Sequence, residues 1–205
     1  QLRKLSQYAY LKIINLVSIV VFYGIVIYLI SVLIGTEKIN IESVKKFIQS
    51  IADSWFITIY CILYLLIPFI NKLIDSISKK NFKILLGILI FFFSIWPSVW
   101  TNTTVQDTGL GIINFIMLYL IGSYIKMYVN DKNVKNKSII VFIVIILINS
   151  ILEIALDRAI HYNFITNIIA ATALFLVFKD IKLKDNKVIN KLASYTFAVY
   201  VIHAN

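Results

Sequence analysis

Ionisable side chains interrupt one long apolar run of this sequence, and they are its first candidates for chemistry. Glu153 follows Asn149 by four residues and precedes Asp157 by four, so a helix would place all three on one face. Arg158 and His161 come shortly after. A carboxylate inside an apolar run is costly and is therefore a candidate for function. The spacing predicts a polar pocket, with Glu153 and Asp157 as catalytic candidates and Arg158 as a substrate-binding candidate. The alternative is a helix that ends early and leaves Glu153 at an interface.

A second candidate for catalysis lies near the end of the sequence. His203 follows the apolar run 197–202. A histidine there can act as a general base or bind a sugar through a hydrogen bond, and the alternative is an interfacial histidine. The sequence holds no phosphate-binding glycine loop, no H-E-x-x-H and no G-x-S-x-G motif. With two histidines far apart and a single cysteine, Cys61, it predicts no metal site.

The elements that must position these side chains are strongly apolar. Hydrophobic residues make up 60% of the 205, charged residues make up 15%, and the mean hydropathy is +0.87. Soluble domains usually contain about 45–50% apolar and about 25% charged residues. This excess cannot be hidden in a soluble core, because the surface must still be covered by polar groups. The composition therefore predicts an all-α fold, a polytopic bundle of transmembrane helices.

Apolar runs near the length needed to cross a bilayer divide the chain into six complete spans and a truncated seventh. The predicted spans are 13–34, 55–71, 84–96, 109–127, 139–156, 164–178 and 192–205. Between the first two spans, apolar residues recur at helical spacing among charged ones, at Ile41, Val44, Phe47, Ile48 and Ile51. This pattern predicts a short amphipathic helix that lies at the membrane interface.

The charges of the loops predict an orientation. The net charge is +10, and lysines gather in the loops 72–83, 126–137 and 179–191, while 100–110 has no basic residue and 157–163 has only Arg158. Basic loops face the cytoplasm. With seven crossings, this rule places Gln1 on the cytoplasmic side and Asn205 on the outer side of the membrane, and it explains the lysines without nucleic acid. The segment 35–53 is the exception, with three lysines offset by three acids. The usage rich in Ile, Lys and Asn suggests a bacterial source, and hence the bacterial cytoplasmic membrane.

Two patches of the sequence resemble a known family. Residues 55–74 read WFITIYCILYLLIPFINKLI and are similar to a span of the membrane acyltransferase 3 family that carries Y-x-x-L-Y-L-L-x-P. Residues 194–205 read SYTFAVYVIHAN and resemble the late T-F-G-x-Y-L-I-H segment of that family. Thr196, Tyr200 and His203 match this segment, and Ala198 stands where glycine is usual. The order and spacing of the intervening runs also fit.

The resemblance implies a ten-span enzyme that moves an acyl group, usually acetyl from cytoplasmic acetyl-CoA, to a sugar hydroxyl of an envelope polysaccharide. Residues 1–205 would form a single acyltransferase-like domain, incomplete at both ends, that covers spans three to nine. The main catalytic histidine of the family lies in its first span. Of its basic motif before the third span, only Lys12 remains here. The implied partners are acyl-CoA, membrane lipid and polysaccharide, without metal or nucleic acid.

The resemblance and the orientation together assign roles to four residues. His203, Tyr200 and Asn205 would line the acceptor side, and Lys12 would lie near the donor side. Two other classes of protein stay open: a polysaccharide flippase or small-solute transporter, and a structural membrane subunit. A transporter would be expected to show internal repeats, broken helices and charges at mid-membrane depth. The sequence shows no convincing repeat and offers only Glu153, toward one face.

Overall fold

The computed structural model describes residues 2–52, 55–100, 107–130, 134–156, 161–179, 181 and 186–204. Every regular element in these ranges is a helix, which confirms the predicted all-α class. The chain divides into two compact units. Unit 1 comprises Gln1–Ile70 and Leu183–Asn205, and unit 2 comprises Asn71–Lys182.

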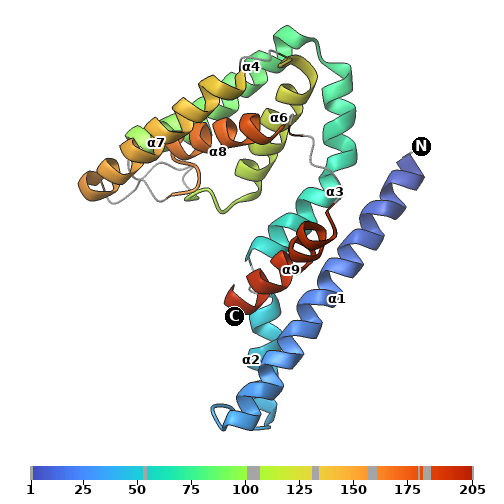
Figure 1. The fold of residues 1–205 in the computed structure, drawn as a ribbon. Coiled ribbons are helices and arrows are strands. Elements are labelled where there is room, and N and C mark those ends of the chain that lie inside the picture. Colours follow the sequence, from blue (N-terminus) through green and yellow to red (C-terminus); the bar gives the residue numbers. More distant parts are fainter. Residues whose placement is uncertain are drawn as a thin grey trace. The chain divides into compact units, whose positions relative to one another are not determined.

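Unit 1 is built around a long first helix. Its elements are α1 (Leu2–Ile34), α2 (Ile41–Ala52), the first part of α3 (Trp55–Ser76) and α9 (Lys187–Ala204). The buried side chains of Val20 and Ile57 join α1 to α3, and Leu16 and Tyr23 pack against them. α1 also lies beside α9, as Figure 1 shows.

Two helices of unit 1 begin earlier than the hydropathy predicted. α1 begins at Leu2, before the apolar run 13–34, and α9 begins at Lys187, before the run 192–205. Hydropathy marks the part of a helix that can enter lipid, which for α1 is Tyr10–Ile34. Helix formation needs only a favourable backbone, and neither polar start contains a glycine or proline that would stop it.

Caps determine the turn between α1 and α2. Gly35 follows α1 with φ +83°, the left-handed conformation that glycine adopts without strain, and its N–H donates to the Val32 carbonyl at 3.1 Å. Asn40 precedes α2, and its side-chain oxygen accepts from the Ser43 N–H at 2.7 Å. The Ser43 hydroxyl donates to the Glu37 carboxylate at 3.0 Å. The connection is therefore held by its own polar groups.

The predicted amphipathic helix is present as α2. The apolar side chains described on it remain exposed, with Ile41 at 78%, Val44 at 41% and Ile48 at 61%. Its polar face carries an exposed ion pair between Lys46 and Glu42 at 3.8 Å. A helix with an exposed apolar face next to a charged face is suited to lie flat at the interface between membrane and water.

Aromatic side chains of α3, the second predicted span, line up along one face of the helix. The rings of Phe56 and Tyr60 stack with centroids 5.8 Å apart, and those of Tyr60 and Tyr64 lie 4.9 Å apart. Residues four apart share a helix face, so the rings form one column. Pro68 lies inside the helix, which continues to Ser76.

Unit 2 contains the remaining helices. They are α4 (Lys79–Ile90), the π-helical η1 (Phe91–Ile95), α5 (Trp96–Val99), α6 (Ile112–Tyr128), α7 (Val134–Leu156) and α8 (Ile165–Phe178). α7 and α8 pack side by side, and α6 contacts both α4 and α8 (Figure 1). Tyr119 of α6 donates to the Asn71 side chain at 2.7 Å, which ties α6 to the last turns of α3.

The third predicted span, 84–96, is longer in the structure because the helix passes through a proline. Ser78 caps its start by accepting from the Asn81 N–H at 3.2 Å. Pro97 has no N–H and would break a regular helix. The preceding turn widens instead, and the Trp96 N–H donates to the Phe91 carbonyl five residues back. Helical structure therefore runs from Lys79 to Val99.

Four helices of the described chain are long and apolar enough to cross a membrane: Tyr10–Ile34, Trp55–Ser76, Lys79–Val99 and Val134–Ala155. The fourth and sixth predicted spans coincide with two shorter apolar helices, α6 and α8. α8 has 14 residues, which is ~21 Å at ~1.5 Å per residue. It is therefore shorter than a hydrocarbon core of ~30 Å.

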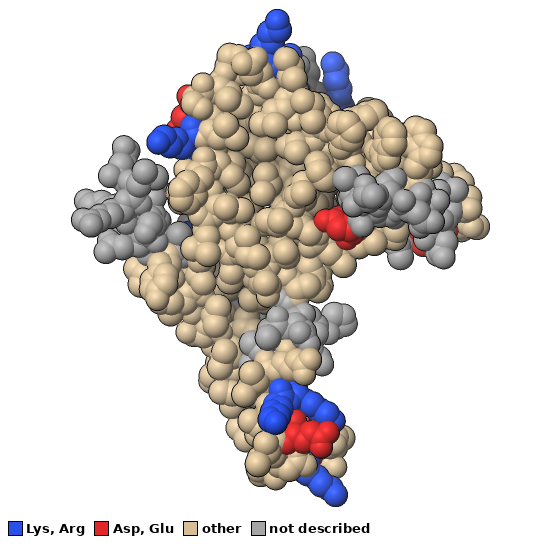
Figure 2. Space-filling model, turned by 180° about the vertical axis from the view of Figure 1, so that it is seen from behind, with Lys and Arg blue, Asp and Glu red and all other residues tan. Residues whose placement is uncertain are grey.

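The surface has the character expected of a protein in lipid. Large apolar side chains point outward, among them Leu33 at 85% and Ile154 at 90% exposed. Figure 2 shows Lys and Arg side chains in a few separate groups, with uncharged residues covering most of the surface on this face. A soluble protein rarely exposes apolar area on this scale. The structure therefore agrees with a membrane-embedded helical protein.

Candidate functional site

Polar side chains gather at one end of unit 2, where α5 and α7 end and α6 and α8 begin. Hydrogen bonds join most of them across these helix ends. We name this cluster the polar junction, and it comprises Ser94, Ser98, Asp107, Asn114, Asn149, Glu153, Asn163, Thr166 and Asn167. Ser94, Ser98, Asn114 and Asn163 are buried.

A tight turn before α6 forms one wall of the polar junction. The Asp107 side chain accepts from the Gly109 N–H at 2.8 Å, and the Asp107 carbonyl accepts from the Leu110 N–H at 3.1 Å. Gly109 has φ +83°, and a Cβ there would lie 2.4 Å from the Asn163 backbone nitrogen. The Tyr162 N–H donates to the Thr108 carbonyl at 2.9 Å. Glycine is therefore required where this turn meets the loop before α8.

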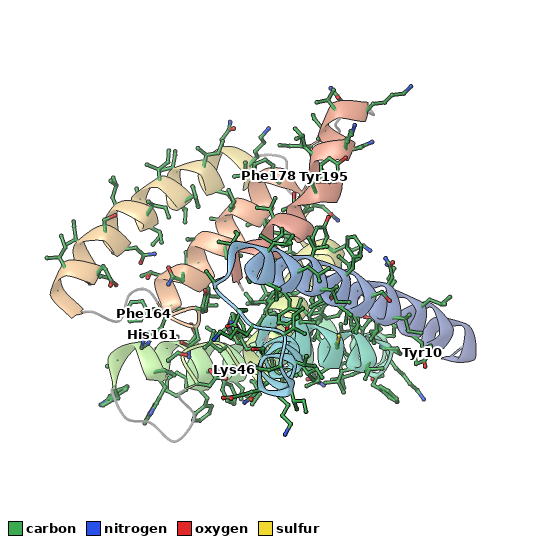
Figure 3. All side chains as sticks on the ribbon, turned by 90° about the horizontal axis from the view of Figure 1, so that it is seen from below. Tyr10, Lys46, His161, Phe164, Phe178 and Tyr195 are labelled. Atoms are coloured by element: carbon green, nitrogen blue, oxygen red, sulfur yellow. The ribbon has the colours of Figure 1, made fainter. Side chains whose placement is uncertain are left out.

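A serine of α5 caps α8 from outside that helix. Phe164, the residue before α8, has no side-chain cap of its own. The Ser98 hydroxyl accepts from the Ile165 N–H at 2.8 Å and donates to the Ser94 carbonyl at 2.6 Å. The Asn163 amide donates to the Phe93 carbonyl at 3.1 Å. These bonds fix the start of α8, which in Figure 3 follows the labelled His161 and Phe164.

An amide network links α7 to α8 in the same region. The Asn149 amide donates to the Asn167 side-chain oxygen at 2.7 Å, and the Thr166 hydroxyl donates to the Asn149 side-chain oxygen. Asn167 in turn donates to the His161 carbonyl at 2.9 Å. Each amide therefore makes at least two hydrogen bonds. Such a network holds its side chains in fixed orientations.

Glu153 stands next to this network and is not part of it. It lies one helical turn after Asn149 on the same face of α7. Its side chain is partly buried, and within the described chain its buried Oε2 has no hydrogen-bond partner. The buried Asn114 side-chain oxygen also lacks a partner there, although the Asn114 amide donates to the Gly109 carbonyl at 2.8 Å. The Ser94 hydroxyl, also buried, lacks a partner there as well. Of these three oxygens only that of Glu153 belongs to a side chain that is not fully buried, so Glu153 is the acceptor best placed for a ligand that carries hydroxyl groups.

The structure tests the predicted pocket at Glu153 only in part. Glu153 and Asn149 share one face of α7 as expected, and Asn149 contacts α8. Asp157 and Arg158 lie outside the described residues. His161 contributes its backbone carbonyl to the polar junction. α7 continues to Leu156, three residues past Glu153. The alternative, an early helix end that leaves Glu153 at an interface, therefore stays open.

The other predicted site residues belong to unit 1. Lys12 is exposed, and its amine lies 5.8 Å from the centroid of the Tyr64 ring. His203 and Tyr200 lie on α9, but their side chains are not among those described, and Asn205 lies outside the described residues. Their roles stay predictions.

Several members of the polar junction were not predicted. Ser98 and Asn167 bond to other helices, and Asn114 bonds to the turn before its own helix. Sequence spacing says nothing about contacts between helices. A signal was nevertheless present, because each is a polar residue next to or inside an apolar run. Among the described residues, no group of three His, Cys, Asp or Glu side chains could hold a metal ion.

Comparison with known proteins gives one positive result. A family model described as an acyltransferase domain matches residues 1–205. No curated protein and no solved structure matches the chain.

Proposed function

Because the chain belongs to the membrane acyltransferase 3 family, we propose that it transfers an acyl group from cytoplasmic acyl-CoA to a sugar hydroxyl of an envelope polysaccharide. Family membership and the apolar helices establish a membrane acyltransferase. The acetyl group as the usual cargo, the sugar acceptor and the bacterial cytoplasmic membrane belong to the proposal.

The reaction requires an acceptor hydroxyl held beside a thioester. The hydroxyl oxygen attacks the carbonyl carbon, a C–O bond forms, and the C–S bond breaks. The hydroxyl proton passes to a general base and ends on the CoA sulfur. The resemblance assigns this base to a histidine of another span. We therefore assign the polar junction to binding of the acceptor and not to proton abstraction.

This assignment rests on one carboxylate oxygen of Glu153, which has no hydrogen-bond donor among the described residues. A partly buried acceptor without a donor costs free energy, and a sugar hydroxyl can supply that donor. The neighbouring amides of Asn149 and Asn167 already hold one another in place, so they give the site a rigid wall. A few fixed polar groups at the end of an apolar bundle suit a ligand that carries many hydroxyls.

The distribution of lysines indicates the side of the membrane on which the acyl-CoA donor binds. The first turn of α4 carries Lys79, Lys80 and Lys83, and α6 ends near Lys126. The polar junction lies at the opposite ends of these helices. If the basic ends face the cytoplasm, the polar junction faces outward, toward the polysaccharide. Lys12, exposed beside Tyr64, remains a candidate for contact with the phosphates of the donor.

The test is acyl transfer by the full-length protein in sealed membrane vesicles. Acetyl-CoA labelled in its acetyl group is supplied on the cytoplasmic face, and label esterified to glycan on the other face is measured. We expect alkali-labile label in the glycan, and none in vesicles without the protein. If an inserted, folded protein transfers no label with any acyl donor and glycan tried, the proposal fails and transport of the glycan becomes the better account.

A further inference from the structure

Unit 2 contains a large cavity that the polar junction does not use. It has a volume of about 620 Å³ and lies among α4, α6, α7 and α8. Its walls are almost wholly aliphatic and aromatic, as at Leu86, Ile121, Val141 and Ile168. The volume falls within the ~300–1,000 Å³ of ligand pockets. Such walls suit a hydrocarbon chain, and they offer too few hydrogen-bonding groups for the hydroxyls of a sugar.

The cavity is about as long as the hydrocarbon part of one membrane leaflet is thick. Its wall on α8 runs from Ile165 to Leu176, which is ~16 Å at ~1.5 Å per residue. Half of a hydrocarbon core of ~30 Å is ~15 Å. A single acyl chain that lies along α8 would therefore fill one leaflet of the membrane.

Positive charge marks one end of the cavity. Lys137, in the first turns of α7, lines the cavity and is itself exposed. Lys179, just after α8, donates to the carbonyl of Val129, another lining residue. Lys79 places its amine 4.8 Å from the centroid of the Tyr128 ring near the same helix ends. Basic pockets between helices on the cytoplasmic side of a membrane attract anionic lipid headgroups.

We propose that this cavity binds one acyl chain of an anionic phospholipid, with the lipid phosphate at Lys137. The apolar walls would exclude water from the chain, and the long lysine side chain would reach the headgroup depth. The site is independent of acyl transfer, so its failure would leave the proposed function untouched.

Native mass spectrometry of the delipidated full-length protein tests the lipid. Phosphatidylglycerol is titrated beside phosphatidylcholine with the same chains, glycerol phosphate without chains, and palmitoyl-CoA. We expect phosphatidylglycerol to bind at least fivefold more tightly than phosphatidylcholine, and glycerol phosphate not to bind. Equal binding of the two lipids, or binding of palmitoyl-CoA in preference to both, would overturn the proposal.

Matched variants locate the binding. Ile169→Trp places a large ring in the cavity from an edge position that is 37% exposed, and Leu174→Trp adds the same ring at 39% exposure on α8 outside it. We expect Ile169→Trp to weaken phosphatidylglycerol binding at least tenfold and Leu174→Trp to leave it within twofold.

A second pair of variants tests the headgroup contact. Lys137→Gln removes the lining charge, and Lys135→Gln removes an exposed charge two residues away that does not line the cavity. About a fivefold loss is expected for Lys137→Gln alone. Equal losses in both variants would mean general charge attraction and would contradict the site. If Ile169→Trp does not fold, this pair decides the question.

Discussion

Glu153 and Asn149 lie one helical turn apart on α7, and they differ in how their polar atoms are satisfied. Asn149 donates to Asn167 and accepts from Thr166. Glu153 Oε2 has no partner among the described residues. An unpaired, partly buried oxygen lowers stability unless a ligand supplies the missing donor. This contrast is why Glu153 is assigned to the acceptor and Asn149 to its support.

The first prediction concerns Glu153→Gln, which keeps the shape of the side chain and removes its charge. A hydrogen bond to a charged group is worth ~1 kcal/mol more than a neutral one, so the KM for the glycan should rise about fivefold to tenfold. kcat should change little, because the residue binds the acceptor and does not take its proton. Initial rates against glycan concentration measure both constants.

Glu42→Gln is the matched control for this experiment. Glu42 is exposed on α2 and pairs only weakly with Lys46 at 3.8 Å. Its replacement should leave KM and kcat unchanged. An unchanged KM in Glu153→Gln would remove Glu153 from the acceptor site, and a fall in kcat alone would point to a role in the chemistry.

The second prediction concerns Gly109, where the turn before α6 meets the backbone of the loop before α8. Gly109→Ala introduces a Cβ at 2.4 Å from the Asn163 nitrogen and forces φ +83° on alanine. We expect a loss of at least ~2 kcal/mol in the free energy of unfolding, seen as a fall of several degrees in Tm in detergent. Gly87→Ala in α4 meets open space and should be neutral or slightly stabilising. Equal Tm values for the two variants would contradict this account.

At the scale of elements, α8 depends on a neighbour for its start. The helix has 14 residues and lacks a side-chain cap at Phe164. Ser98 supplies the missing acceptor to the Ile165 N–H. Ser98 is available because α5 continues past Pro97, which the widened turn of η1 permits. The irregular helix and the start of α8 are therefore one structural unit.

The third prediction follows from this contact. Ser98→Ala leaves the Ile165 N–H without its acceptor, which costs ~1–3 kcal/mol. Hydrogen exchange in the first turn of α8 should become at least about fivefold faster. Ser76→Ala is the control, since the Ser76 hydroxyl is exposed and bonds only to Leu73 of its own helix. Exchange that is unchanged in Ser98→Ala would show that α8 is fixed by other contacts.

At the scale of the whole molecule, the two ends of the helical path Lys79–Val99 differ in charge. Its start carries three lysines, and its end leads into a loop without basic residues. The family match covers both units, residues 1–205. The orientation of this helical path in the membrane can therefore be measured by labelling its two ends.

The fourth prediction tests that orientation with single cysteines introduced into a full-length protein in which Cys61 and any cysteine outside residues 1–205 are replaced by serine. A cysteine at Trp100, which is 52% exposed, should react with an impermeant maleimide in intact cells. A cysteine at Lys80 should react only after the membrane is opened. The cysteine-free protein supplies the unlabelled background. The reverse pattern would place the polar junction in the cytoplasm and would contradict an external acceptor.

Much of the fold could be predicted because hydropathy and helical spacing are local properties. The amphipathic helix α2 and the apolar helices α3 and α6 are observed where the sequence predicted them. Helix ends were predicted less well. α1 and α9 extend beyond their apolar runs, and Pro97 is accommodated within a helix, because helix formation does not require apolar residues.

The sequence by itself determined the class of the protein and its family, since composition and motifs can be read locally. It also singled out Glu153 as a candidate, because a carboxylate in an apolar run is visible without the structure. Only the tertiary structure decided that Asn149 pairs with Asn167, that Ser98 caps α8, and that four helices enclose a cavity. The physical reason is that these features depend on which helix faces meet. Apolar helices pack with many neighbours, and hydropathy does not distinguish among them.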